Sequence, residues 1–344
     1  MYSISDNYSL QNHNTFGLPA RADHFVRCNS AEDIALFIAD NPFPEKPMLI
    51  LGEGSNILFV EDFRGVVLNP AIRNITISDE TVDTVAITAG AGLNWDEFVA
   101  WCVERNYGGI ENLSLIPGAV GAAPIQNIGA YGAEAGDVIS EVHYIDAGSG
   151  KEQAISNEDC QFAYRSSIFK RELKNRVIIT DVVFRLSKKP LLKTTYGNIS
   201  SRLSDIKNPG ISDIRKTVID IRNEKLPDPA KTGNAGSFFK NPVIERGHYE
   251  ELRQYHPEIP SYPVPEKDQV KIPAAWLIEK CGLKGITEGN TGTWHKQPLV
   301  VVNHGSATGR EILSFAEKIR KSVDENFGIR LETEVNIMYS AGSR

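Results

Sequence analysis

The sequence predicts an α+β protein with more than one domain. Short strand-like and helix-like segments are mixed along 344 residues, which is long enough for two or three domains of ordinary size. Pro227 and Pro229 interrupt the pattern late in the chain, and the run Ile116–Gly132 fits neither the helical nor the strand period. We therefore expect two or three domains, with a boundary near the two prolines.

The composition is typical of a globular protein, with 41% hydrophobic and 24% charged residues. A formal net charge of −7 provides no general attraction to nucleic acid or to anionic membranes. No apolar run approaches the length of a membrane span, and the first residues lack the basic and apolar regions of a signal peptide. We expect a cytoplasmic protein that binds neither nucleic acid nor membrane.

The four cysteines are far apart in the sequence and form no Cys-x-x-Cys pair. This spacing argues against a zinc site and against a disulfide framework. It favours a reducing compartment and gives no metal ligand set.

Hydrophobic periodicity and cap residues predict the elements of the first half in order. Ser30 begins a helix whose apolar stripe continues to Ile38, and Asn94 caps a second helix after the turn Gly90-Ala91-Gly92. Strands are predicted at 48–51, 85–89 and 177–186, with a hairpin around 148–150.

The second half is predicted to be helical at three places and to end in a strand. A helix over 212–225 is stopped by the two prolines, which mark a domain boundary. Another helix begins at Pro273 and ends at Gly282, and the capping box Thr308–Glu311 begins a helix that ends at Gly328. The alternation over 330–338 predicts a closing strand.

The run Ile116–Gly132 is the most informative segment. No charged side chain lies between Glu111 and Glu134, and the run contains four glycines and two prolines. Two prolines together with Gln126 and Asn127 argue against a membrane helix, and a flexible linker would carry more serine and charge. Small residues allow bare backbone to approach a large flat group, so the run indicates a cofactor site.

Two glycine turns invite a dinucleotide interpretation, and neither fits it. Gly52-Glu53-Gly54 follows a strand but precedes more strand-like residues, while Gly90-Ala91-Gly92 precedes a helix; both lack the third glycine. A Rossmann fold is therefore not expected. Backbone N–H groups of the first turn, with Ser55 and Asn56 as donors, could still bind a diphosphate. Taken alone, Gly52–Gly54 is better interpreted as a β-hairpin turn.

Three motifs occur here in a fixed order: Leu51–Asn56, Ile116–Gly132 and Gly233–Pro242. Together they resemble the UDP-N-acetylenolpyruvoylglucosamine reductase family, over about Thr15 to Ile337. The resemblance implies an FAD-binding fold of the vanillyl-alcohol-oxidase/p-cresol-methylhydroxylase type in two subdomains, plus an α+β substrate-binding domain. The implied boundaries are 1–71 (with the closing segment 329–344 near the active site), 72–226 and 227–328. The segment Thr195–Asn198 looks like the type I branch.

The resemblance also implies an activity. Members reduce UDP-N-acetylglucosamine enolpyruvate to UDP-N-acetylmuramate for peptidoglycan, with non-covalent FAD and with NADPH as co-substrate. Hydride goes to the far carbon of the enol ether, which leaves negative charge on the near carbon and its carboxylate. Such a reaction needs a cation, a stabilising partner and a proton donor. We expect a monomer with this small-molecule substrate.

The residues that match the family's catalytic positions are Arg165, Ser237 and Glu334. A planar guanidinium suits a developing carboxylate charge, and a positioned hydroxyl can protonate a strongly basic carbon. Local sequence leaves other interpretations open: an arginine in a basic surface loop, a serine in a turn, and a solvated carboxylate on a polar strand face. Thr333 stands where the family commonly has proline.

The remaining site residues also follow from the resemblance. Cofactor contacts are expected from Gly52, Gly54, Ser55, Asn56, Gly118, Gly121, Gln126 and Gly132. Substrate contacts are expected from Tyr164, Tyr196, Lys225, Asn241 and Gln297, with Tyr196 in a loop that closes over the diphosphate.

Other functions fit less of the sequence. An FAD oxidase or dehydrogenase of the same fold would share the first two motifs but not the Ser237 motif with Arg165 and Glu334. An inactive FAD-binding protein would need none of the three. A hydrolase using Glu332 and Glu334 is disfavoured, because neighbours on one strand face point in parallel rather than flanking a bond.

Overall fold

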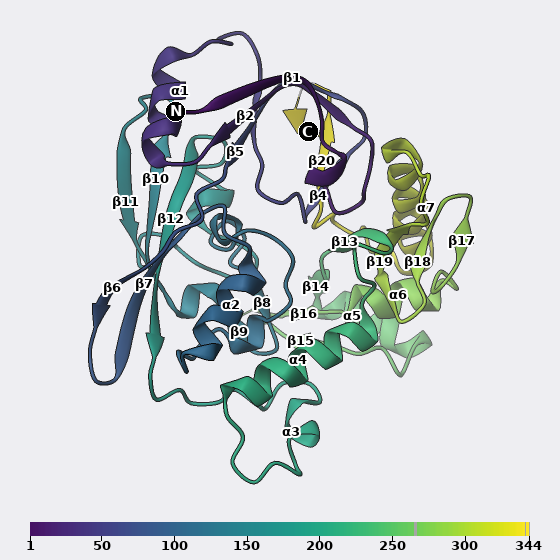
Figure 1. The fold of residues 1–344 in the computed structure, drawn as a ribbon. Coiled ribbons are helices and arrows are strands. Elements are labelled where there is room, and N and C mark those ends of the chain that lie inside the picture. Colours follow the sequence, from purple (N-terminus) through teal and green to yellow (C-terminus); the bar gives the residue numbers. More distant parts are fainter. Residues whose placement is uncertain (265–266, 341, 344) are drawn as a thin grey trace. The chain divides into compact units, whose positions relative to one another are not determined.

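The computed structural model describes residues 1–264, 267–340 and 342–343. The chain divides into two compact units (Figure 1). Unit 1 comprises Met1–Tyr8, Ala22–Gly54 and Arg64–Arg222, and unit 2 comprises Ser9–Arg21, Ser55–Phe63 and Asn223–Arg344. One of the boundaries between the units therefore falls directly after Gly54, at the end of the first glycine turn.

Unit 1 is built on two sheets. The first has the strand order β1 (Ser3–Ser9), β2 (Arg21–Cys28), β5 (Phe63–Pro70) and β3 (Met48–Ile50), with β3 parallel to β5. The second is antiparallel, in the order β11 (Glu152–Ser156), β10 (Ile139–Asp146), β12 (Val177–Ser187), β7 (Thr84–Gly90) and β6 (Ile75–Glu80). An antiparallel order of this kind excludes a Rossmann sheet, as predicted.

Helices cover these sheets because each has one apolar face. Helix α1 (Ala31–Asp40) buries Ile34 and Phe37 against Ile145 and Ile178. Helix α2 (Trp95–Glu104) buries Trp95 and Phe98 in the core of the second sheet. The predicted caps are both present: Ser30 Oγ accepts the N–H of Asp33, and Asn94 Oδ1 accepts the N–H of Glu97.

A smaller core follows the second sheet. Helices α3 (Ile199–Arg202) and α4 (Ile211–Lys225) pack through Ile199, Leu203, Ile214, Val218 and Ile221. Tyr131 packs against this cluster, which brings the end of the run Ile116–Gly132 to α4. The short strands β8 (Gly129–Ala130) and β9 (Ala133–Glu134) form a hairpin at the same end of the run.

Unit 2 contains a sheet in the order β13 (Gly233–Ser237), β19 (Gln297–Asn303), β18 (Thr291–Trp294) and β17 (Thr287–Glu288). Helices α6 (Ala274–Lys280) and α7 (Gly309–Phe327) pack on it. A second sheet has the order β14 (Val243–Glu245), β16 (Gln269–Lys271), β15 (Tyr262–Pro263), beside α5 (Arg246–Tyr255). A third joins β21 (Gly342–Ser343), β20 (Asn336–Tyr339) and β4 (Ile57–Phe59).

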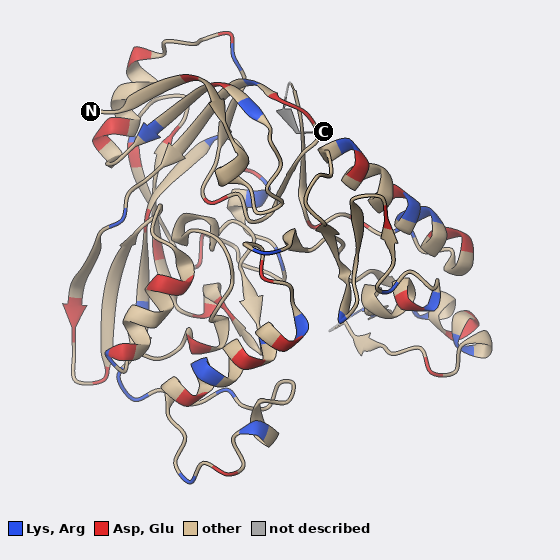
Figure 2. Ribbon diagram, turned by 45° about the vertical axis from the view of Figure 1, so that its right-hand side comes forward, with Lys and Arg blue, Asp and Glu red and all other residues tan. Residues whose placement is uncertain are grey.

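Helix α7 shows how local sequence sets an element in unit 2. Thr308 and Glu311 form the predicted capping box, and Gly328 ends the helix at a φ of 63°. A side chain at Gly309 would overlap the carbonyl oxygen of Phe59, so only glycine lets the helix begin against β4. Charged residues of both signs recur along α7 and α4 (Figure 2).

Two predictions about local structure are wrong. The segment 330–338 is not one strand, because the strand β20 begins only at Asn336, and Asn336, Ile337 and Met338 are the residues that pair with β4. Before that, the N–H of Glu334 binds the carbonyl of Phe238, and the N–H of Asn336 then binds the carbonyl of Asn56. The chain changes pairing partner and bends between the two, although Leu331 and Val335 are both buried as the alternation predicts.

The turn Gly52–Gly54 is not a β-hairpin turn either. The strand before it, β3, pairs with β5, while the strand after it, β4, pairs with β20 in another sheet. A strand–turn–strand pattern cannot by itself distinguish a hairpin from a crossing between sheets. The other helices and strands predicted from the sequence are confirmed to within a few residues.

Some predicted segments are only partly described. Residues 265–266 of the segment 227–328, and residues 341 and 344 of the segment 329–344, lie outside the described residues. In the part of the chain that is described, no helix is long and apolar enough to cross a membrane. The described chain also holds no group of three or more His, Cys, Asp or Glu side chains suited to a metal ion.

Candidate functional site

The run Ile116–Gly132 forms an irregular surface segment of unit 1. Gly118 and Gly132 have φ values of 132° and 79°, which favour glycine. Its exposed members are uncharged, and Ile125 is 38% exposed. The exposed residues are Pro117, Ala122, Ile125 and Gly132. The segment therefore presents backbone and apolar surface, as expected for a flat cofactor.

The start of this run is fixed against the beginning of α2. The N–H of Trp95 binds the carbonyl of Gly118 at 2.8 Å, and the N–H of Gly121 binds the carbonyl of Ala91 at 2.9 Å. A Cβ at Gly121 would lie 2.6 Å from that of Ala91, so a larger residue does not fit there. The N–H of Gly121 is therefore already hydrogen-bonded within the protein. Gly121 could contact a cofactor by letting it approach the backbone closely, but not by donating a hydrogen bond to it.

The first glycine turn packs against the same run. A Cβ at Gly52 would lie 3.3 Å from that of Ala119, and Gly54 has a φ of 68°. The Glu53 carboxylate accepts hydrogen bonds from Asn94 Nδ2 and from the N–H of Gly118, while burial raises its pKa. Unit 1 therefore brings Gly52 and Gly118 together, as the predicted cofactor site requires.

Arg165 lies at the tip of a two-residue turn. Ala163 and Ser166 exchange two backbone hydrogen bonds of 3.0 Å, and Arg165 has a φ of 53°. A non-glycine residue in this conformation stores about 1 kcal/mol of strain. Such strain is common where a side chain is aimed at a ligand. Tyr164 is 53% exposed beside it, with the guanidinium carbon 5.8 Å from its ring centre.

Side chains connect this turn to the glycine-rich run. Ser167 Oγ donates to the carbonyl of Ile125 at 2.6 Å, and Asn127 Nδ2 donates to the carbonyl of Ala163 at 3.3 Å. Arg165 Nη1 lies 3.4 Å from where a Cβ of Gly129 would be. The predicted catalytic arginine therefore lies directly against the predicted cofactor segment.

Tyr196 lies at the other end of the same run. It is 59% exposed, and its Cβ lies 3.4 Å from where a Cβ of Gly132 would be. Its ring meets Tyr131 edge to face, with 6.5 Å between the centres. Asn112 Nδ2 donates to the carbonyls of both Tyr131 and Lys193, which ties the Tyr196 loop to the run.

Ser237 ends β13 in unit 2, beside a register irregularity in its pairing with β19. Gly236 precedes it at a φ of 69°, and the N–H of Phe238 binds the carbonyl of Leu299 at 2.8 Å. Among the described residues, none is hydrogen-bonded to Ser237 Oγ. The turn hydrogen bond considered as an alternative role is therefore not found, and the hydroxyl is available to a ligand.

Glu334 is held next to this segment. Its N–H binds the carbonyl of Phe238 at 2.8 Å, and its carbonyl accepts Asn56 Nδ2 at 3.3 Å. Unit 2 thus places the backbone of Glu334 between the Asn56 side chain and Phe238, the residue that follows Ser237. Glu332 instead pairs with Lys240 at 2.9 Å, and this hydrogen bond lowers its pKa. Glu332 is therefore a surface ion-pair partner.

The predicted substrate residues of unit 2 have varied surroundings. Lys225 is exposed as the last residue of α4. Asn241 Oδ1 accepts the N–H of Ala274 at 3.0 Å, so its carbonyl holds the start of α6. Gln297 begins β19, and its buried Oε1 has no hydrogen-bond partner in the described chain. A buried acceptor of that kind fits a ligand that donates to it.

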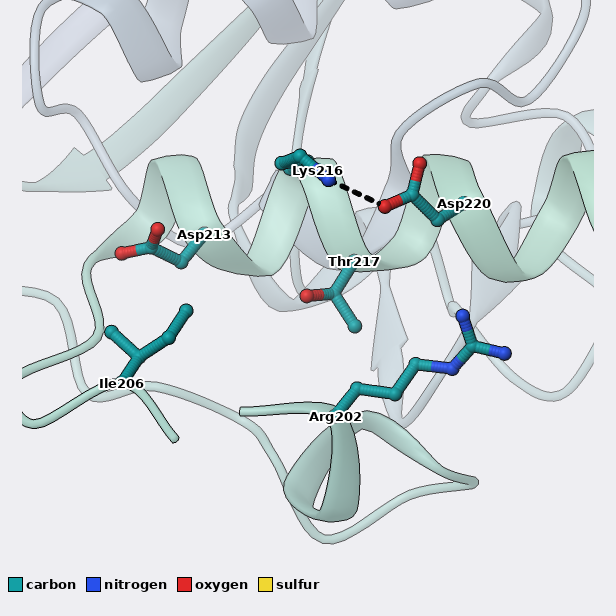
Figure 3. Close-up of a pocket in the computed structure, with 6 residues that line it drawn as sticks. All are labelled: Arg202, Ile206, Asp213, Lys216, Thr217 and Asp220. Carbon is teal, nitrogen blue, oxygen red and sulfur yellow. Dashed lines mark hydrogen bonds and ion pairs between the residues drawn. The ribbon is translucent and has the colours of Figure 1, made fainter. Parts of the chain in front are cut away.

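A hollow of about 330 Å³ lies between α3 and α4 (Figure 3). Charged and polar side chains line most of it, and Lys216 pairs with Asp220 across one turn of α4. The lining residues are Arg202, Ile206, Asp213, Lys216, Thr217 and Asp220. None of them belongs to the predicted site.

Sequence reasoning missed the residues that fix the site. Asn127 and Ser167 are buried polar residues whose side chains hold the Arg165 turn, and Glu53 joins two glycine segments. No periodicity marks such residues. The only available signal was for Asn127, a polar residue within an uncharged run.

Two sequence models of known families match the chain. One, described as an FAD binding domain, matches residues 22–156, and one for the UDP-N-acetylenolpyruvoylglucosamine reductase C-terminal domain matches residues 228–338. The first range includes both Gly52–Gly54 and the run Ile116–Gly132. The exposed uncharged surface of that run fits FAD, whose ring system is large and flat.

Curated relatives match over almost their whole length. The UDP-N-acetylenolpyruvoylglucosamine reductase of Flavobacterium johnsoniae is 42% identical over 97% of this chain and 99% of its own. That of Porphyromonas gingivalis is 44% identical over 96% of this chain and 98% of its own.

A solved structure shows the fold. UDP-N-acetylenolpyruvylglucosamine reductase from Thermus caldophilus superposes with a TM-score of 0.67 at 20% identity, over 98% of both chains. With the FAD-binding match, this likeness confirms the predicted α+β fold with an FAD-binding region followed by a separate C-terminal domain.

Proposed function

This chain belongs to the UDP-N-acetylenolpyruvoylglucosamine reductase family, and we propose that it reduces UDP-N-acetylglucosamine enolpyruvate to UDP-N-acetylmuramate with bound FAD. The observation that carries this proposal is 42–44% identity to reductases of that name across nearly the whole chain. NADPH is the proposed co-substrate. The reaction supplies a peptidoglycan precursor, and a cytoplasmic monomer is the proposed form.

FAD bound here would supply the redox chemistry, the transfer of a hydride from NADPH to the far carbon of the substrate's enol ether. We propose that it is held by residues 1–71 and 72–226, and the sugar nucleotide by 227–328. Gly52, Gly54 and Gly132 allow close backbone approach, and Ser55 and Asn56 supply polar groups. The other proposed FAD contacts are Gly118, Gly121 and Gln126.

Arg165 is proposed to bind the substrate carboxylate. Hydride addition leaves negative charge on the near carbon and its carboxylate, and a permanently charged planar guanidinium stabilises that charge with two parallel hydrogen bonds. The geometric support is that the Arg165 guanidinium lies against Gly129, which belongs to the glycine-rich run. Tyr164, beside it in the same turn, is a proposed substrate contact.

Ser237 is proposed to protonate the near carbon, and Glu334 to assist it. A free hydroxyl is a weak acid, but the enolate-like acceptor is strongly basic, so a positioned hydroxyl can transfer its proton. The support is that no described residue binds Ser237 Oγ, while Glu334 is fixed beside Phe238. These roles give atom balance: one hydride and one proton add across the double bond.

The substrate's diphosphate needs local donors in a chain of net charge −7. We propose Lys225 and Tyr196 for this role, because both are exposed and carry a donor on a long side chain. Asn241 Nδ2 and Gln297 are the proposed contacts to the rest of the substrate.

One spectroscopic experiment tests the function. The purified protein should show flavin absorption that NADPH bleaches without air, and that UDP-N-acetylglucosamine enolpyruvate then restores. Bands that return only with oxygen would indicate an oxidase of the same fold. A colourless protein that takes up no added FAD would overturn the cofactor assignment.

A further inference from the structure

The carboxylate of Glu53 lies between two segments that the proposed function assigns to FAD. Both of its oxygens are within reach of Asn94 Nδ2, at 2.9 and 3.0 Å, and it also accepts the N–H of Gly118. Glu53 itself belongs to the turn Gly52–Gly54. One side chain therefore links that turn, the first turn of α2 and the run Ile116–Gly132.

The orientation of Asn94 is fixed by its other contact. Its Oδ1 caps α2 by accepting the N–H of Glu97 at 3.0 Å, so its Nδ2 must face Glu53. Asn94 also forms an isolated backbone bridge with Ala119, directly after Gly118. The amide cannot turn over without uncapping the helix, and Glu53 must therefore present an acceptor to it.

Burial makes an ionised carboxylate energetically unfavourable at this position. Burial raises the pKa of Glu53, which means that the ionised form is disfavoured by its surroundings, although the two hydrogen bonds oppose that effect. Of the charged groups near it, Arg73 favours the ionised form and Glu97 opposes it. A neutral side chain would fill the same space without the cost of burying a charge. The glutamate is therefore better explained by a need for two acceptor oxygens.

We propose that Glu53 is a positioning residue that holds the Gly52–Gly54 turn and Gly118 at the separation FAD binding requires. The carboxylate points to protein donors, so it is not itself an FAD contact. This inference rests on the proposed function, because that function makes both segments parts of one cofactor site. This role predicts that loss of one carboxylate oxygen of Glu53 weakens FAD binding strongly. The stability of the FAD-free protein should change much less.

The first test is Glu53→Gln. Glutamine keeps the shape but offers one acceptor oxygen, and its NH₂ group opposes Asn94 Nδ2. We expect FAD to bind at least about tenfold more weakly to the deflavinated full-length variant, as measured by quenching of flavin fluorescence. The melting temperature of the FAD-free variant should change little, because removal of a buried charge offsets the loss of one hydrogen bond to Asn94.

A double variant tests the hydrogen-bond geometry itself. When Glu53→Gln is combined with Asn94→Asp, the introduced aspartate can still cap α2 and can accept from the new glutamine NH₂, while the glutamine oxygen accepts from Gly118. We expect FAD affinity to recover to within about threefold of the wild type. Asn94→Asp alone, which places two carboxylates together, should weaken FAD binding like Glu53→Gln does.

Glu97→Gln is the matched control, since Glu97 is an exposed carboxylate on the same turn of α2 that pairs with Arg73. Its FAD affinity should stay within about twofold of the wild type. The proposal is overturned if Glu53→Gln binds FAD like this control, if the double variant shows no recovery, or if Glu53→Gln destabilises the FAD-free protein as much as it weakens binding. A wild-type protein that binds no FAD would instead reject the proposed function.

Discussion

The turn that carries Arg165 and the strand end that carries Ser237 are held in different ways. Around Arg165, side chains make the connections: Ser167 Oγ and Asn127 Nδ2 bind carbonyl groups of neighbouring segments. Around Ser237, backbone groups make most of them, since Phe238 pairs with both Leu299 and Glu334, and one buried side chain, that of Asn234, accepts the N–H of Gly236. Backbone pairing forms with almost any side chain, whereas side-chain anchors depend on one residue type. Substitutions near Arg165 should therefore change structure and chemistry together, and substitutions at Ser237 should change chemistry alone.

The largest expected effect is that of Ser237→Ala. This variant tests whether a substitution at Ser237 changes the chemistry and leaves the structure intact. Transfer of hydride and proton to the enolpyruvyl substrate should slow by about 10²- to 10⁴-fold, because the proton donor is lost. Flavin reduction by NADPH should be unchanged, and so should the unfolding transition. Anaerobic stopped-flow absorption separates the two half-reactions. If both slowed equally, Ser237 would not be the proton donor.

Asn127→Ala tests whether side-chain anchors hold the Arg165 turn. Asn127 is 2% exposed; it donates to Glu134 and Ala163 and accepts from the N–H of Gly136, all from a φ of 46°. Its loss leaves buried groups without partners, so the free energy of unfolding should fall by about 3 kcal/mol in urea titrations. Reduction of the substrate should slow as well, because the Arg165 turn loses an anchor.

Asn175→Ala is the control for the backbone conformation of Asn127. Asn175 has a similar φ of 61° but is exposed, so alanine there should cost only about 1 kcal/mol. Equal losses at the two positions would mean that the strained backbone, and not the side-chain anchors, dominates at Asn127.

The same distinction explains what the sequence could predict. Helix α7 followed from a capping box, an apolar stripe and Gly328, which are all local signals. The strands predicted at 48–51, 85–89 and 177–186 were found, but other paired segments, such as β2, β5 and β19, were not predicted, and in the segment 330–338 the chain changes partner before β20 begins. Anchors such as Ser167 could not be predicted, because they join residues about 40 positions apart through one hydrogen bond. The site residues themselves came from motif resemblance, and the contacts that fix them came only from the structure.

Two ion pairs extend the comparison to pH. In unit 1, Asp96 binds Arg215 through two hydrogen bonds of 2.6 and 3.0 Å and also accepts the N–H of Leu115, which has a φ of 59°. Burial works to raise the pKa of Asp96, but these hydrogen bonds outweigh it and hold the pKa below its usual range. In unit 2, Glu332 and Lys240 form a more exposed pair.

Asp96→Asn should therefore cost about 2 kcal/mol of unfolding free energy at neutral pH, whereas Glu332→Gln should cost less than about 0.5 kcal/mol. A lowered pKa means that the stability from Asp96 is present above the ordinary aspartate pKa and is lost as the pH falls through the lowered value. The difference between wild type and Asp96→Asn should shrink below about pH 4, as urea titrations across pH 3–7 can measure. A difference that grew as the pH fell would contradict the assignment.

The smallest expected effect is that of Tyr196→Phe, which removes one hydroxyl from an exposed residue in the side-chain-anchored region. The ring keeps its contacts with Tyr131 and Gly132, so the loop should stay in place and stability should not change. A lost hydrogen bond to the diphosphate should raise KM for the enolpyruvyl substrate by about tenfold, with little change in kcat or in reduction by NADPH. Tyr255→Phe, at an 81% exposed position on α5, is the matched control and should leave KM unaltered. An unchanged KM for Tyr196→Phe would remove Tyr196 from the substrate site, while a fall in stability would show that its hydroxyl anchors the loop instead.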